Sequence, residues 1–75
     1  MFINSLAKGL KVLSIFTEKE KELSLTEISQ RLNMSKGSIQ RVTYTLTSLG
    51  YLEKNEETKK YQLGLKVLTL GFTLL

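Results

Sequence analysis

Residues 24–50 read SLTEISQRLNMSKGSIQRVTYTLTSLG, and this stretch decides the fold. Ser24 and Glu27 have the spacing of a capping box, in which each side chain accepts a hydrogen bond from the other residue's backbone amide. After this start, apolar residues recur at helical spacing, at Leu25, Ile28 and Leu32. Asn33 tolerates left-handed backbone geometry, so we expect the helix to end there.

A second helix is predicted after a short joint, residues 33–35. Ser35 is a good N-cap and Gly50 is a good stop signal, so this helix is expected to cover 35–49. Its apolar side chains form a stripe on one face, at Ile39, Val42, Leu46 and Leu49. Two helices separated by so short a joint have the spacing of a helix-turn-helix.

The residues before this pair predict a further helix over 6–16, with Ser5 as its cap. Its apolar stripe is formed by Leu6, Leu10, Leu13 and Phe16. Two cations and two apolar residues lie off this stripe, namely Lys8, Lys11, Val12 and Ile15. We expect the two cations to point outward. Residues 17–22 read TEKEKE and hold no apolar residue, which predicts a solvated connection.

The hydrophobic period changes after Gly50. Short strand-like runs at 51–54 and 61–63 flank a polar stretch and predict a two-stranded hairpin, which must pack on the helices to be stable. From residue 65 a last helix is apolar on nearly all sides. The order of elements is that of a mainly α fold with a small β-hairpin, a winged helix-turn-helix with a three-helix core and a two-stranded wing.

Composition excludes several function classes. The 75 residues contain no cysteine and no histidine, which removes disulfides, the usual zinc ligands, thiol nucleophiles and the commonest general base. We therefore expect no enzyme, no metal and no cofactor. No stretch approaches about 20 apolar residues, so we expect no membrane span and a cytoplasmic protein. The net charge of +4 favours polyanionic partners.

The face of helix 35–49 opposite its apolar stripe suits the DNA major groove. The helix holds two cations and no anion, and Arg can pair bidentately with guanine and Gln with adenine. The candidate DNA-binding residues of this helix are Ser35, Lys36, Gly37, Ser38, Gln40, Arg41, Tyr44 and Thr45. The wing, 52–63, adds Lys54, Lys59 and Lys60 for the DNA backbone or an adjacent minor groove.

Each of these features also has a plainer interpretation. An exposed Arg41 can be a solvated charge, Tyr44 can lie half-buried against a neighbouring element, and nearby glutamates dilute the charge of the wing lysines. One alternative function is a winged helix used as a protein–protein interaction or dimerisation module, and another is RNA binding. A protein-binding version would tolerate acidic residues between 35 and 48, and none occurs there.

Five runs of sequence occur in a specific order along the chain. They are SLAKGLKVL (5–13), LTEI (25–28), MSKGSIQRV (34–42), LTSLGYL (46–52) and YQLG (61–64). This ordered set resembles the N-terminal DNA-binding domain of IclR-type transcriptional regulators, over roughly residues 5–75. The resemblance implies a DNA-binding domain at 5–64 and, at 65–75, the start of a linker helix to a C-terminal domain that is absent from this chain.

The resemblance also implies partners and site residues. Regulators of this family, which repress or activate transcription, bind double-stranded operator DNA as dimers, and their C-terminal domain senses a small-molecule effector. Arg41 stands where the family usually has an arginine on the helix that reads DNA, and Lys36 stands where a basic residue is common. Asn33 replaces a usual glycine. Thr43 stands where an aliphatic residue is expected, which would weaken packing at the edge of that helix.

The two ends of the chain predict a homodimer through the first and last helices. The last helix would expose Leu68, Leu70, Phe72, Leu74 and Leu75. The first helix offers Val12 and Ile15 off its core stripe, and a core this thin cannot cover both sets. A two-fold mate that buried them would place two DNA-reading helices about one DNA turn, or a multiple of it, apart.

Overall fold

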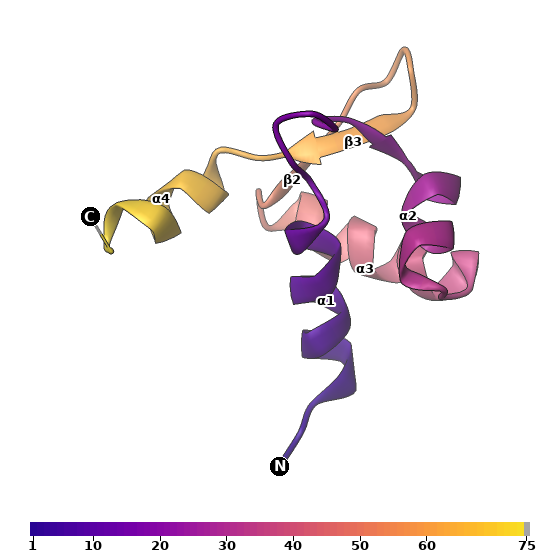
Figure 1. Ribbon diagram of the computed structural model, residues 1–75, viewed down its shortest axis with the longest axis horizontal. Coiled ribbons are helices and arrows are strands. Elements are labelled where there is room, and N and C mark those ends of the chain that lie inside the picture. The colour runs from indigo at the N-terminus through magenta and orange to yellow at the C-terminus, as the bar shows by residue number, and fades with distance from the viewer. Residues whose placement is uncertain (75) are drawn as a thin grey trace.

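The computed structural model describes residues 1–74. In chain order its elements are α1 (Asn4–Ser14), β1 (Leu23–Ser24), α2 (Leu25–Leu32), α3 (Lys36–Ser48), β2 (Leu52–Lys54), β3 (Lys60–Leu63) and α4 (Lys66–Phe72). In Figure 1, α1, α2 and α3 lie together with the sheet along one side, and α4 extends away from them. The predicted winged helix-turn-helix is confirmed. The predicted last helix ran to Leu75, which lies outside the described residues.

The α2–turn–α3 unit forms as its local sequence dictates. The Ser24 hydroxyl accepts from the Glu27 amide at 3.1 Å, and the Glu27 carboxylate accepts from the Ser24 amide at 2.8 Å. The hydrogen bond that the Ser24 backbone amide donates to the Glu27 carboxylate is the largest cause that lowers the pKa of Glu27. Asn33 ends α2 with a left-handed φ of 54°, and Ser35 caps α3 by accepting from the Ser38 amide at 3.2 Å. The predicted boundaries of both helices are therefore confirmed.

The sheet has three antiparallel strands rather than two, in the order β1-β3-β2. The wing hairpin pairs β2 with β3, with Leu52 opposite Leu63. The predicted two-stranded wing is confirmed, and β1 is a further strand that was not predicted, which pairs with the other edge of β3 and places Leu23 opposite Tyr61. The Leu23 side chain is only 1% exposed, so burial of this one residue holds the strand in place. A strand of two residues is too short to show an alternating sequence pattern.

The core is formed where α1, α2, α3 and the sheet meet. Its buried hydrophobic residues are Val12, Phe16, Leu23, Ile28, Ile39, Leu52 and Tyr61. The stripe predicted for α1 is wrong in its first half, because Leu6 and Leu10 are more than half exposed while Val12 is fully buried. Only the C-terminal half of α1 packs into the core, so the apolar residues of its first turns remain largely exposed to solvent.

The buried face of α3 is rotated relative to its predicted stripe. Thr43 is fully buried beside Ile39, whereas Leu49, predicted to face the core, is 55% exposed. Thr43 occupies the middle of the packed face and not its edge. Its hydroxyl donates to the Gln40 carbonyl at 3.1 Å, which satisfies the polar atom inside the core.

Close backbone packing joins the end of α3 to the start of α4. Gly50 has a φ of 89°, a conformation that favours glycine. A Cβ added at Gly64 would lie 2.2 Å from the Gly50 carbonyl oxygen, so this contact needs glycine at 64. The Gly64 amide donates to the Tyr51 carbonyl at 2.9 Å, which completes the junction. The glycine of the YQLG run therefore has a packing role.

Candidate nucleic-acid interface

The turn between α2 and α3 fixes the orientation of α3. The Ser29 hydroxyl donates to the Met34 carbonyl, and the Met34 amide donates back to the Ser29 carbonyl at 3.1 Å. Ser29 is itself buried, and α3 packs on both α1 and α2. The exposed face of α3 is therefore presented by a rigid unit, as a surface that reads another molecule requires.

This exposed face contains the predicted residues of α3. Those in contact with solvent are Ser35, Lys36, Gly37, Gln40, Arg41, Tyr44 and Thr45, while Ser38 is half-buried. Tyr44 is 74% exposed, so the interpretation of a half-buried ring is wrong. Within residues 1–74, the side chains of Lys36, Gln40 and Arg41 have no hydrogen-bond or ion-pair partner in the protein. They are free to bind another molecule.

The wing lysines are less uniform. The Lys54 ammonium lies 5.7 Å from the centroid of the Tyr61 ring, over its face. Lys59 adopts a left-handed φ of 63° in the hairpin turn and pairs with Glu56 at 3.3 Å, with both side chains mostly exposed. Lys60 begins β3 and is half-buried. Because Lys59 is partly neutralised, Lys54 is the more available charge of the wing.

Two cations outside the predicted DNA-binding set, Arg31 and Lys8, contact other parts of the protein. The Arg31 guanidinium forms a two-pronged ion pair with the Glu20 carboxylate, which raises the pKa of Arg31 and lowers that of Glu20. This pair ties the 17–22 segment to α2, and that segment is not simply solvated. Lys8, predicted to point outward, is half-buried, and its ammonium donates to the Ser38 hydroxyl on α3 at 3.2 Å.

Lys8 therefore belongs to the α3 surface although sequence analysis missed it. The contact joins residues that are 30 positions apart in the chain, so no local sequence pattern announces it. It arises because α1 packs across α3. Among the described residues, no group of histidine, cysteine or acidic side chains is placed to hold a metal ion, and no helix is long and apolar enough to cross a membrane.

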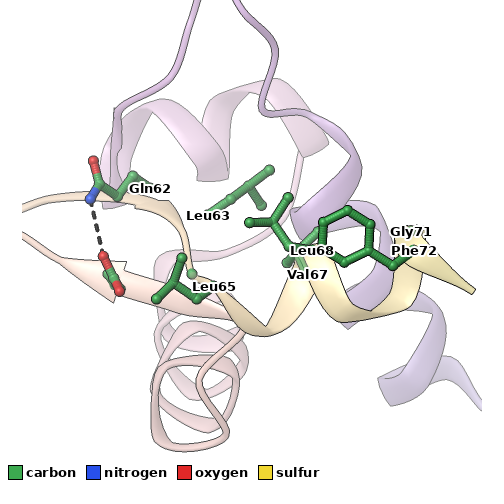
Figure 2. Close-up of a pocket in the computed structure, with 9 residues that line it drawn as sticks. Gln62, Leu63, Leu65, Val67, Leu68, Gly71 and Phe72 are labelled. Atoms are coloured by element: carbon green, nitrogen blue, oxygen red, sulfur yellow. Dashed lines mark hydrogen bonds between the residues drawn. The ribbon is translucent and has the colours of Figure 1, made fainter.

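A second surface surrounds α4. A groove of about 550 Å³ separates α4 from the wing, and Figure 2 shows its labelled apolar side chains. These are Leu63, Leu65, Val67, Leu68 and Phe72. At its polar edge the Gln62 side chain donates to the Glu53 carboxylate at 3.1 Å, drawn as the dashed line in Figure 2. Leu65 and Phe72 are each about two-thirds or more exposed, at 73% and 67%.

The family model of the IclR helix-turn-helix domain matches residues 5–56, a range from the second residue of α1 to just past the end of β2. The chain belongs to the IclR family. Its predicted membership is therefore confirmed, and DNA-binding regulation of transcription is the function class of this IclR-type domain. The matched region holds all predicted site residues except Lys59 and Lys60.

Similar proteins of known name are transcriptional regulators. The regulator XynR of Escherichia coli is 36% identical over 92% of this chain, and the regulator KdgR of Dickeya chrysanthemi is 41% identical over 91% of it. The crystal structure of an IclR family transcriptional regulator from Brucella abortus superposes with a TM-score of 0.93 and 38% identity over 97% of this chain. The IclR-type domain spans only 27%, 23% and 28% of the lengths of these three proteins.

Proposed function

We propose that this IclR-type domain binds double-stranded operator DNA in a sequence-specific manner, with α3 in the major groove. The observation that carries the proposal is the exposed face of α3. It presents Lys36, Gln40 and Arg41 with no partner among residues 1–74, and α3 itself holds no acidic residue. Uncompensated cations beside an amide on a rigid helix match the acceptors and donors of base edges.

Roles follow from position along α3. Arg41 and Gln40 lie one turn into the helix, where side chains reach base edges, and Gly37 leaves room for close approach. Ser35, Lys36 and Ser38 lie in the cap and first turn, where phosphate oxygens are favoured by free amides and the helix dipole. Tyr44 and Thr45 extend the same face. The Thr45 hydroxyl donates to the Arg41 carbonyl at 3.0 Å, so it offers DNA an acceptor.

The wing is proposed to contact the DNA backbone or an adjacent minor groove through Lys54, Lys59 and Lys60. Lys54 and Lys60 lie at the ends of the paired strands, on either side of the turn that holds Lys59. Such contacts position the domain on the duplex and carry no sequence information.

We also propose that the protein acts as a homodimer through α1 and α4. Val12 cannot contribute, because it is fully buried, and Ile15 packs partly against the core. The exposed apolar residues of α1 are Leu6 and Leu10, at 59% and 56%. Those of α4 include Leu68, Leu70 and Phe72, all more than half exposed. Burial against a mate would contribute about 25 cal/mol for each Å² of apolar area, before the costs of association.

We further propose that this domain is joined to a C-terminal domain, as the greater length of its relatives suggests. The domain 5–64 would read DNA, and α4 would begin a linker, residues 65–75, to a C-terminal domain that binds a small-molecule effector. Its support is that the matched relatives are several times longer than this chain, which covers 27% of XynR.

A salt titration of duplex binding tests the DNA proposal. If about four cations of each subunit contact phosphates, log affinity should fall against log salt with a slope of roughly −3 to −4 per subunit. A single-stranded oligonucleotide and an RNA duplex serve as controls, because comparable binding to either would favour RNA recognition. A flat salt response, or no binding to a pool of random duplexes, would overturn the proposal in favour of a protein-binding winged helix.

A further inference from the structure

Lys8 belongs to α1, and its charged side chain contacts α3. Its ammonium donates to the Ser38 hydroxyl oxygen at 3.2 Å. An ammonium group can only donate, so the Ser38 oxygen acts as acceptor in this bond and its own hydrogen is free to donate elsewhere. The Ser38 amide is already used, since it donates to the Ser35 hydroxyl. Lys8 therefore presents Ser38 to the outside as a hydrogen-bond donor.

The pair lies on the rim of a groove between α1 and α3. The groove has a volume of about 510 Å³, and its polar lining consists of Ser5, Lys8, Ser38, Arg41 and Thr45. No carboxylate lines it, and neither Lys8 nor Arg41 forms an ion pair within residues 1–74. Two cations and a donor hydroxyl thus face one space with no anion to neutralise them, although a carboxylate would be the usual neighbour of a half-buried cation.

We propose that Lys8 and Ser38 together hold one phosphate of the DNA backbone at the α1–α3 groove. The inference rests on the proposed function and adds α1 to the DNA-contacting surface. An ammonium has three donors, so Lys8 can keep its bond to Ser38 while it donates to a phosphate oxygen. The Ser38 hydrogen supplies a second donor to the same group. Because phosphate contacts fix register, Lys8 is a positioning residue for Arg41, which lines the same groove.

The test compares Lys8→Gln with Lys11→Gln by measuring duplex affinity across a salt series. Both changes remove one positive charge from α1, but Lys11 is exposed and does not line the groove. Lys8→Gln should make the salt slope shallower by about 0.9 and weaken binding about tenfold at moderate salt, for all duplexes alike. Lys11→Gln should leave the slope unchanged. Equal changes in both variants, or no change in Lys8→Gln, would overturn the inference.

A double-mutant cycle tests whether the two residues act on one phosphate. Ser38→Ala and Lys8→Gln together should weaken binding by less than the product of their separate effects, because each change disables the same contact. Strictly multiplicative losses would overturn the shared site. Thermal unfolding of each variant should match the wild type, since neither residue belongs to the buried core. If wild-type binding is itself independent of salt, the proposed function fails; if it is steep and Lys8→Gln is silent, only this inference fails.

Discussion

α3 and α4 expose opposite kinds of surface. α3 is capped by Ser35, packs on α1 and α2, and leaves outside a face on which Lys36 and Arg41 have no partner among the described residues. α4 has no side-chain cap, contains no buried residue, and leaves Leu68 and Phe72 in solvent. Figure 1 shows the same difference, with α3 inside the helical group and α4 extending from it.

The difference teaches which partner each helix is suited to meet. A face of unpaired cations is stable in water, and it favours a nucleic acid because it neutralises phosphates and releases the counterions condensed on them. An apolar face is destabilised by water in proportion to its area, so it favours another protein surface. The surface proposed for DNA is therefore the cationic face of α3, and the surface proposed for dimerisation includes the apolar face of α4.

The largest expected effect concerns the junction that joins these two helices. Gly64→Ala should destabilise the domain by about 3 kcal/mol, because the new methyl would lie against the Gly50 carbonyl oxygen. Chemical denaturation measures this change. Gly71→Ala is the matched control, since a Cβ there meets nothing within 4 Å and alanine favours helix. Equal destabilisation by both changes would show that the Gly50–Gly64 contact does not hold the junction.

The next effect is on the DNA-reading side of the comparison. Arg41→Ala should weaken operator binding by about 1–3 kcal/mol and relax the preference at one base step. Lys59→Ala should weaken all duplexes alike and by less, because Lys59 is already paired with Glu56. Selection of binding sites from a random pool, followed by affinity measurement, separates the two results. Uniform and equal losses would mean that Arg41 contacts the backbone and that another part of α3 reads the bases.

A third effect tests the apolar side. Phe72→Glu should raise the dissociation constant of the dimer about tenfold, because it places a charge in the proposed interface. Leu10→Glu tests the contribution of α1 in the same way. Sedimentation measures both, and each variant should lose more affinity for a full operator than for a half-site. Wild type that sediments as a monomer at tens of micromolar would contradict a dimer interface within this domain.

Sequence predicted the local features of this comparison well. The caps at Ser24 and Ser35 and the left-handed Asn33 are encoded within a few residues of each helix end, so the boundaries of α2 and α3 could be predicted. The fold class followed from the order of these elements.

Sequence predicted less well which side of a helix is buried. Val12 and Thr43 are buried, and Leu6 and Leu49 are exposed, because the packing of the helices on one another decides what each helix covers. The Lys8–Ser38 contact depends on the packing of α1 on α3. These features are set by packing between distant segments, which a periodic pattern cannot specify.

The smallest expected effect is on the pH dependence of the free energy of unfolding, through the capping box of α2. Hydrogen bonding from the Ser24 amide lowers the pKa of Glu27 in the folded protein below the ordinary value of 4.5. As the pH falls below 4.5, the unfolded chain therefore binds a proton first, and the free energy of unfolding decreases until the folded carboxyl is also protonated. Glu27→Gln should flatten this decline, because glutamine can still accept in a capping box but does not titrate there. The change is expected to be small, because the Glu27 side chain is only partly buried. Unfolding curves between pH 3 and pH 7 measure the decline in the free energy of unfolding.

Amide hydrogen exchange shows where acid weakens the structure. α4 carries no acidic residue, so a loss of amide protection at low pH in α4, rather than in α2 and α3, would contradict this account of how the packed helices are held.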